Sequence, residues 1–143
     1  MTTTPEKILY TARASATHGR DGHAQTDDGL LDVDLAPPKE MGGPGGATNP
    51  EELLGAAHSA CYTMQLTALL GEKGGTVHSI ETKADVSLGE DPDGGFKIHT
   101  IALIVRGEVE GVDEAGFAEA AESAKNSCPL SKAIAGVDTI TLD

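Results

Sequence analysis

The sequence has 143 residues, which suffices for a single core, and we expect residues 1–143 to form one domain. Its formal net charge of -13 opposes contact with nucleic-acid phosphates and anionic membrane surfaces, so neither is an expected partner. Two cysteines do not make a disulfide scaffold, and no apolar run is long enough to span a bilayer. These features predict a cytoplasmic protein with two free thiols.

The amino-terminal third alternates apolar and polar side chains in the manner of β-strands. Residues 7–16 have this period of two, and residues 31–35 repeat it. Turn residues gather at positions 18–22 and 28–29. We therefore expect an antiparallel meander, which the proline pair at residues 37–38 ends.

A long helix is predicted directly after a glycine-rich loop at residues 42–46. Asn49 supplies a cap, Pro50 suits the first helical position, and strong helix formers continue from Glu51 to about Lys73. Apolar residues occur on almost every side of this segment. That distribution predicts a central helix that is buried rather than laid on a surface.

The carboxy-terminal half predicts a hairpin, two helices and a last strand. The hairpin joins strands at residues 77–88 and 96–109 through a turn-rich loop. A second helix, residues 113–126, starts with an aspartate cap. A short helix at residues 128–135 and a strand at residues 137–142 complete the expected elements.

The two cysteines occupy different predicted environments. Cys61 lies in the middle of the long helix among apolar neighbours, where burial would raise the pKa of its thiol. A reactive Cys61 therefore requires a nearby positive charge or donors to the thiolate. Cys128 precedes Pro129 at a helix start, where backbone N–H groups and the helix dipole favour an anion. Simple packing of Cys61 and a boundary role for Cys128 remain open as structural alternatives.

Other candidate residues are fewer, and none predicts a metal site. The five histidines are not clustered, and the cysteine spacing matches no zinc motif. Glu51 lies in the first helical turn, about 15 Å along the helix from Cys61, so it can serve that thiol only through a second chain or a bridging arginine. Arg20 occupies a turn, where it is either solvated or able to swing toward a ligand.

Three motifs give the sequence a family resemblance. They are GGPGGATNPEEL at residues 42–53, SAC at residues 59–61 and SCPLS at residues 127–131. With these motifs in this order the chain resembles, over essentially its whole length, the OsmC/Ohr family of osmotically inducible and organic hydroperoxide resistance proteins. Residues 19–22 are more similar to the Ohr branch and residues 55–58 to the OsmC branch, so the branch stays open.

The resemblance implies an α+β fold in which two chains form an intertwined homodimer, with antiparallel sheets around two long central helices and active sites at the subunit interface. It also implies roles for four residues. Cys61 would be the peroxidatic thiol, Cys128 the resolving thiol, and Arg20 with Glu51 the pair that steadies the thiolate. No bound cofactor is implied.

The activity implied by the resemblance is the reduction of organic hydroperoxides to alcohols, through a sulfenic acid and an intramolecular Cys61–Cys128 disulfide. A dithiol reductant of the lipoyl type would then reduce the disulfide. Apolar walls that include Met41, Leu53 and Met64 would favour organic over hydrogen peroxide. Two alternatives are a non-catalytic, stress-induced binding protein and a thiol redox sensor that passes its disulfide to a partner.

Overall fold

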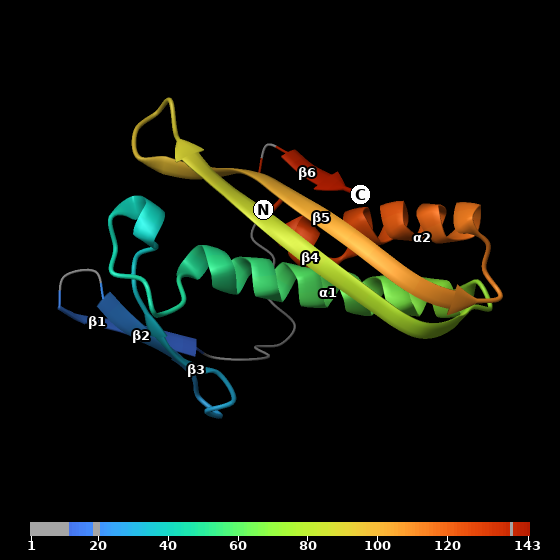
Figure 1. Ribbon diagram of the computed structural model, residues 1–143, viewed down its shortest axis with the longest axis horizontal. Coiled ribbons are helices and arrows are strands. Elements are labelled where there is room, and N and C mark those ends of the chain that lie inside the picture. The colour runs from blue at the N-terminus through green and yellow to red at the C-terminus, as the bar shows by residue number, and fades with distance from the viewer. Residues whose placement is uncertain (1–11, 19–20, 138) are drawn as a thin grey trace, which may run out of the picture. The chain divides into compact units, whose positions relative to one another are not determined.

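The computed structural model describes residues 12–18, 21–137 and 139–143 (Figure 1). The chain divides into two compact units, Met1–Pro50 and Glu51–Asp143, which are taken separately below. The beginning of the predicted first strand and the candidate Arg20 lie outside the described residues.

The first unit contains an antiparallel sheet in the order β1-β2-β3. Its strands are β1 (Ala12–His18), β2 (Asp21–Thr26) and β3 (Asp32–Leu35). A short 3-10 helix, η1 (Lys39–Met41), follows the two prolines. The meander and its end at the proline pair are thus as predicted, for the part of these elements that the structure describes.

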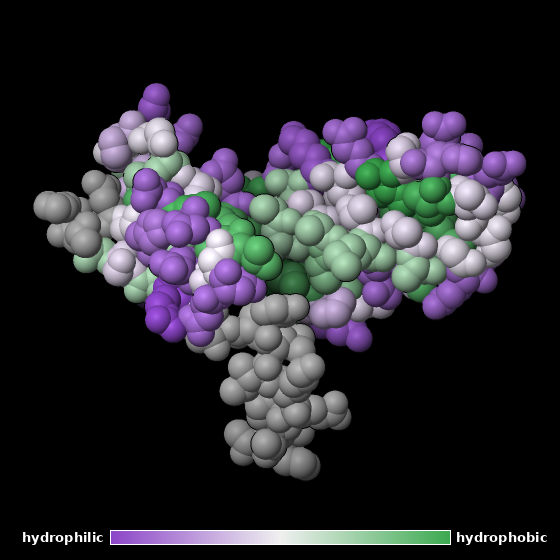
Figure 2. All heavy atoms as spheres, turned by 90° about the horizontal axis from the view of Figure 1, so that it is seen from below, coloured by the Kyte–Doolittle hydropathy of each residue, from purple (hydrophilic) through white to green (hydrophobic). Residues whose placement is uncertain are grey.

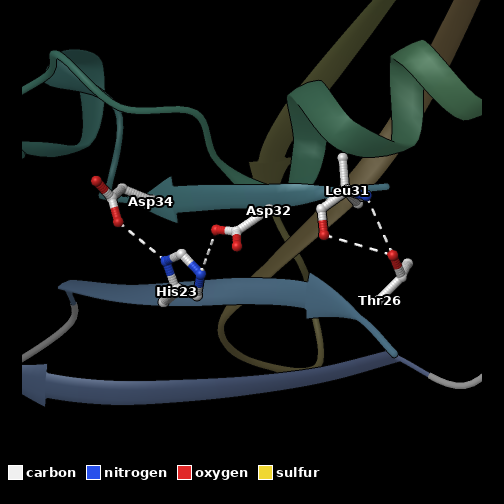
Figure 3. A network of polar contacts seen from close by, with 5 residues as sticks. All are labelled: His23, Thr26, Leu31, Asp32 and Asp34. Atoms are coloured by element: carbon white, nitrogen blue, oxygen red, sulfur yellow. Dashed lines mark hydrogen bonds and ion pairs between the residues drawn. The ribbon is translucent and has the colours of Figure 1, made fainter. Parts of the chain in front are cut away.

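Exposed side chains of β2 form polar contacts with β3 and with the turn between the two strands (Figure 3). The His23 ring lies between two carboxylates of β3, with Nε2 2.7 Å from Asp32 and Nδ1 2.9 Å from Asp34. The hydrogen bond with Asp34, supported by Asp32, raises the pKa of His23. The hydroxyl of Thr26 accepts the N–H of Leu31 at 3.1 Å and so helps to close the turn between the strands.

The second unit is built on a long hairpin. Strands β4 (Thr76–Glu90) and β5 (Phe96–Glu110) pair antiparallel, and β6 (Thr139–Leu142) pairs parallel to β5. The hairpin is as predicted, with slightly longer strands. The parallel β5–β6 pair makes this sheet mixed, a feature that the apolar pattern of one short strand does not specify.

Three helices accompany this sheet: α1 (Pro50–Glu72), α2 (Glu114–Ser127) and α3 (Pro129–Ala133). Pro50 opens α1 as predicted, and the Asp113 carboxylate caps α2 by accepting the Gly116 N–H at 2.7 Å. Helix α3 ends two residues earlier than predicted. The α+β fold class is therefore confirmed.

The core of the second unit lies between the sheet and the two longer helices, which Figure 1 shows on one side of the β4–β5 hairpin. Each of α1, β5 and α2 contributes three residues: Tyr62, Leu66 and Leu70; Ile101, Leu103 and Val105; Ala120, Ala121 and Ala124. Helix α2 contributes only alanines to this core, and the Tyr62 hydroxyl of α1 donates to the Ala121 carbonyl of α2 at 3.0 Å.

Two glycines fix how α1 fits its surroundings. A Cβ atom on Gly55 would lie 3.3 Å from the Cγ2 atom of Val86, so the absence of a side chain allows β4 to cross close to the helix. At the other end Gly74 has φ 82, and the Gly75 N–H bonds to the Leu70 carbonyl at 2.9 Å. A left-handed glycine with this bond ends the helix cleanly.

One face of α1 is exposed in the single chain. The sheet and α2 cover only the stripe that contains Tyr62, Leu66 and Leu70. From Ala56 to Ala68 the exposed residues are Ala56, Ala57, Ala60, Met64, Thr67 and Ala68, and Glu52, Gly71 and Glu72 are exposed nearer the two ends. Figure 2 shows hydrophobic surface along this side of the second unit. The prediction that the helix is buried all round is wrong for one chain, because its own elements pack against a single face.

We predict that Leu66→Ala lowers the free energy of unfolding by about 2–5 kcal/mol, since Leu66 is fully buried and truncation leaves a cavity. Leu30→Ala is the matched control, because Leu30 is 88% exposed. Guanidinium denaturation at one fixed protein concentration measures both variants. Equal midpoints for the two variants would contradict the assignment of the core.

Candidate active site

The centre of the candidate site is a contact between the two cysteine sulfurs. Cys61 lies in the middle of α1, and Cys128 joins the end of α2 to the start of α3. Packing of these helices brings residues 67 positions apart into contact, with Sγ atoms separated by 2.9 Å. Both thiols are free. A disulfide requires about 2.05 Å, so a small movement would allow the bond to form.

The two thiols differ in exposure and electrostatic environment. Cys128 is fully buried, whereas Cys61 is partly exposed. Burial raises the pKa of the Cys61 thiol and the neighbouring Cys128 raises it further, while a hydrogen bond from the Leu130 backbone amide acts in the opposite direction. Within the described residues the net effect thus favours the protonated form of Cys61.

The described arginines pair with carboxylates of their own units. Arg13 pairs with Asp27 on the first unit, and Arg106 contacts the carboxylate of Asp143 at 3.4 Å and its backbone carbonyl at 3.2 Å. Arg106, the described arginine of the second unit, therefore does not supply the positive charge that Cys61 requires.

Two side-chain hydrogen bonds link the helices on either side of the sulfurs. The Nε2 atom of His58, on α1, lies 2.8 Å from the Oγ atom of Ser131, on α3. One turn beyond Cys61, the Gln65 amide donates to the Ser127 hydroxyl at 3.1 Å. The cysteine pair therefore lies between two polar links that join the same segments of the chain.

Two of the buried polar groups near the sulfurs are held in their neutral forms. Tyr62 donates its hydroxyl to the Ala121 carbonyl at 3.0 Å, and burial raises its pKa to about 12. Burial lowers the pKa of His58, which is fully buried. A neutral phenol and a neutral imidazole can therefore act here as fixed hydrogen-bonding groups.

The structure brings together two of the four predicted site residues. Cys61 and Cys128 are in contact, as just described. Glu51 lies in the first turn of α1, and because α1 is one continuous helix, the separation of about 15 Å from Cys61 holds. Arg20 lies outside the described residues. The roles of Arg20 and Glu51 remain predictions.

Sequence analysis did not identify His58 and Ser131 as part of the site. Their spacing from the cysteines could have indicated them. His58 precedes Cys61 by three residues on a helix, which places both on one face, and Ser131 follows Cys128 by three residues. A histidine and a serine are common on helices, so only the observed contact gives this spacing a meaning.

Metal binding and membrane crossing receive no support from the described residues. Among them, no three His, Cys, Asp or Glu side chains gather in a group that could hold a metal ion. None of the helices in the described part of the chain combines the length and apolar character needed to cross a membrane.

Comparison with known proteins identifies the family. A family model described as OsmC-like protein matches residues 43–143, which include both cysteines and the whole second unit, Glu51–Asp143. The chain belongs to the OsmC family. This membership confirms the resemblance carried by the three sequence motifs.

Relatives of this chain include proteins named for the Ohr branch and proteins named for the OsmC branch. The organic hydroperoxide resistance protein of Xanthomonas axonopodis pv. citri is 39% identical over 140 residues, 96% of each chain. Peroxiredoxin OsmC of Escherichia coli is 49% identical over 96 residues, 67% of this chain and 65% of the other. These two matches leave the branch unresolved, as predicted.

Solved structures support the same fold. A crystal structure from Legionella pneumophila, named as an organic hydroperoxide resistance protein OsmC, has a TM-score of 0.81 and 38% identity, covering 95% of this chain and 97% of the other. The OhrB protein of Bacillus subtilis has a TM-score of 0.76 and 36% identity, covering 95% and 100%. The OsmC fold is therefore shared across nearly the whole length.

We predict that the ring of His58 titrates below the ordinary value of 6.5 and that of His23 above it, because burial opposes the charge on His58 whereas carboxylates favour it on His23. NMR titration of the imidazole resonances, assigned with His58→Gln and His23→Gln, measures both. A His58 ring that gains its proton at higher pH than His23 would contradict the burial found here.

Proposed function

We propose that this protein is a cysteine-based peroxidase that reduces organic hydroperoxides to alcohols. The observation that carries the proposal is the contact between the Cys61 and Cys128 sulfurs at 2.9 Å in a member of the OsmC family. The relatives named as organic hydroperoxide resistance proteins and as a peroxiredoxin support the same activity.

The reaction follows in two steps from this pair of thiols. The Cys61 thiolate attacks one peroxide oxygen, the O–O bond breaks, and the leaving alkoxide takes a proton to become the alcohol. Cys61 is then a sulfenic acid. Cys128 attacks that sulfur, the S–O bond breaks, and the oxygen leaves as water. The product is a Cys61–Cys128 disulfide, and a dithiol must reduce it before the next turnover.

Exposure supports this assignment of the two roles. The peroxide must reach the first thiol, and Cys61 is partly exposed, whereas Cys128 is fully buried. A buried second thiol meets only the sulfenic acid beside it. The opposite assignment would require the peroxide to reach a sulfur that solvent does not reach.

We predict that one equivalent of cumene hydroperoxide removes both free thiols of the wild-type protein, because each oxidised Cys61 condenses with Cys128. Thiol titration before and after the peroxide measures the loss. Cys61→Ser should keep its remaining thiol, and Cys128→Ser should stop at a sulfenic acid that dimedone labels. Unchanged thiols in the wild type would rule out the peroxidase and favour a non-catalytic binding protein.

Arg20 is our proposal for the positive charge that Cys61 requires, with Glu51 as the carboxylate that orients it. Burial raises the pKa of Cys61, so the thiolate needs a stabilising partner at neutral pH. The family resemblance assigns that role to Arg20 and Glu51. A guanidinium would stabilise both the thiolate and the alkoxide that develops during attack.

For Arg20→Ala we expect kcat/KM for cumene hydroperoxide to fall by about 10²- to 10³-fold, the loss typical of one preorganised donor. The pH at which iodoacetamide begins to alkylate Cys61 should rise in the same variant. Arg13→Ala is the matched control, since Arg13 pairs with Asp27. Equal losses in the two variants would exclude a specific role for Arg20.

We also propose a homodimer that covers the exposed face of α1. Between Ala56 and Ala68 the exposed residues of this face are apolar apart from Thr67, and Met64 is 74% exposed in the single chain. Exposed apolar surface on a long central helix is typical of an interface between subunits. Glu51 lies about 15 Å from Cys61 on the same helix. A second subunit could bring its own arginine and glutamate close to Cys61.

We predict that Met64→Glu converts the dimer to a monomer, because it places a charge on the covered face. Ser123→Glu, on the exposed side of α2, is the control and should remain dimeric. Sedimentation equilibrium gives both masses. A wild-type protein that is monomeric at micromolar concentration would contradict the proposed dimer.

The reductant remains a prediction from the family resemblance, and the location remains a prediction from the composition of the chain. A lipoyl-type dithiol and a cytoplasmic location agree with the proposed cycle, which needs a source of reducing thiols. The redox-sensor alternative shares the first two steps and differs only in passing the disulfide to a partner protein. Repeated turnover with a small dithiol distinguishes the enzyme from the sensor.

A further inference from the structure

A buried hydrogen bond connects the helix that carries Cys61 to the short helix that follows Cys128. It joins the Nε2 atom of His58 and the Oγ atom of Ser131 at 2.8 Å. His58 is fully buried, and Ser131 is 7% exposed. Each partner lies three residues from one of the cysteines, so the bond spans the same two segments as the contact between the sulfurs.

We propose that His58 and Ser131 are positioning residues that hold Cys128 against Cys61 and thereby set the rate of disulfide formation. The inference rests on the proposed peroxidase function and adds residues to it. The bond acts on the second step, in which Cys128 attacks the sulfenic acid. In the first step it acts only through the turn that places the Leu130 amide at the Cys61 sulfur, so we expect a smaller effect on the reaction of Cys61 with the peroxide.

The His58–Ser131 hydrogen bond matters because α3 is too short to hold its position alone. Helix α3 spans only Pro129–Ala133, and its backbone connects it to Cys128 through the Lys132 N–H, which bonds to the Cys128 carbonyl at 3.1 Å. A helix of about one turn has little stability of its own. A side-chain bond from Ser131 to α1 therefore fixes where this turn, and the sulfur at its start, lies relative to Cys61.

The cost of burying His58 favours such a role over simple packing. Within the described part of the chain, its Nδ1 atom is the buried side-chain nitrogen or oxygen without a hydrogen-bond partner. An unsatisfied buried polar atom costs about 1–3 kcal/mol. A leucine or methionine would fill a similar volume without that cost. The bond that Nε2 makes with Ser131 is the specific feature that these residues cannot supply.

The chemistry of the second step explains why position matters. The Cys128 sulfur must approach the Cys61 sulfur from 2.9 Å to about 2.05 Å while the S–O bond breaks, hydroxide leaves, and the thiol proton converts it to water. Attack within a held pair gains a large effective concentration, and a displacement of about 1 Å can cost about 10²-fold in rate.

The test measures the two steps separately in Ser131→Ala. Stopped-flow mixing with cumene hydroperoxide follows loss of the Cys61 thiol, and mass spectrometry with dimedone follows the lifetime of the sulfenic acid. We expect the first step to stay within about 3-fold of wild type and disulfide formation to slow by about 10- to 100-fold. The longer-lived sulfenic acid should also over-oxidise to sulfinic acid at lower peroxide concentration.

Three further variants exclude a general loss of stability. Ser131→Thr keeps the hydroxyl and should restore the wild-type rate of disulfide formation. Ser59→Ala removes a hydroxyl that bonds within α1 to the Ala56 carbonyl, and should leave both steps unchanged. The double change His58→Leu with Ser131→Ala replaces both polar partners by apolar groups, so it should recover stability while disulfide formation stays slow.

The outcomes separate this inference from the proposed function. If wild-type protein forms neither a sulfenic acid nor a disulfide, the peroxidase proposal fails. If wild type forms the disulfide and Ser131→Ala forms it equally fast, the peroxidase stands and the positioning role of His58 and Ser131 is overturned. A double variant that forms the disulfide at the wild-type rate also overturns it, because packing alone would then suffice.

Discussion

The structure of the second unit depends on the packing of α1 against the segment that contains α2 and α3. The buried stripe of α1 that begins near Tyr62 shares one core cluster with β5 and with the alanines of α2, and the Tyr62 hydroxyl donates to the Ala121 carbonyl. That packing places the Cys61 and Cys128 sulfurs 2.9 Å apart, although 67 positions separate them along the chain. The fold thus supplies proximity, which is the main contribution a protein makes to forming a disulfide in a single molecule.

The same packing creates an electrostatic difficulty. A thiol placed in an apolar interior gains a raised pKa, and only the thiolate attacks a peroxide efficiently. One contribution in the right direction comes from the Leu130 amide at the start of α3. We propose that Arg20, oriented by Glu51, supplies the remainder. In this proposal, different parts of the molecule supply proximity and charge. The contact between the cysteines does not by itself favour the thiolate.

Much of this fold could be predicted from local sequence, since Pro50 and Gly74 mark the limits of α1 and alternating residues mark the hairpin. The reactivity of Cys61 could not be predicted from local sequence, because burial raises the pKa of a thiol. Only the flanking family motifs favoured a nucleophile. The contact of His58 with Ser131 was missed for a related reason. It depends on how helices pack, which residue spacing within each helix does not determine. The sequence predicted more burial of α1 than one chain provides. An apolar pattern on both faces of a helix does not show whether the same chain or another chain covers the second face.

The central claim is that the Cys61–Cys128 pair supports repeated reduction of organic hydroperoxides. Steady-state kinetics with cumene hydroperoxide and hydrogen peroxide, each with dihydrolipoamide or a thioredoxin-type reductant, tests it most directly. We expect many turnovers per protein with dihydrolipoamide, a higher kcat/KM for the organic peroxide, and no turnover in Cys61→Ser. A single turnover with every reductant, or equal activity in Cys61→Ser, would contradict it.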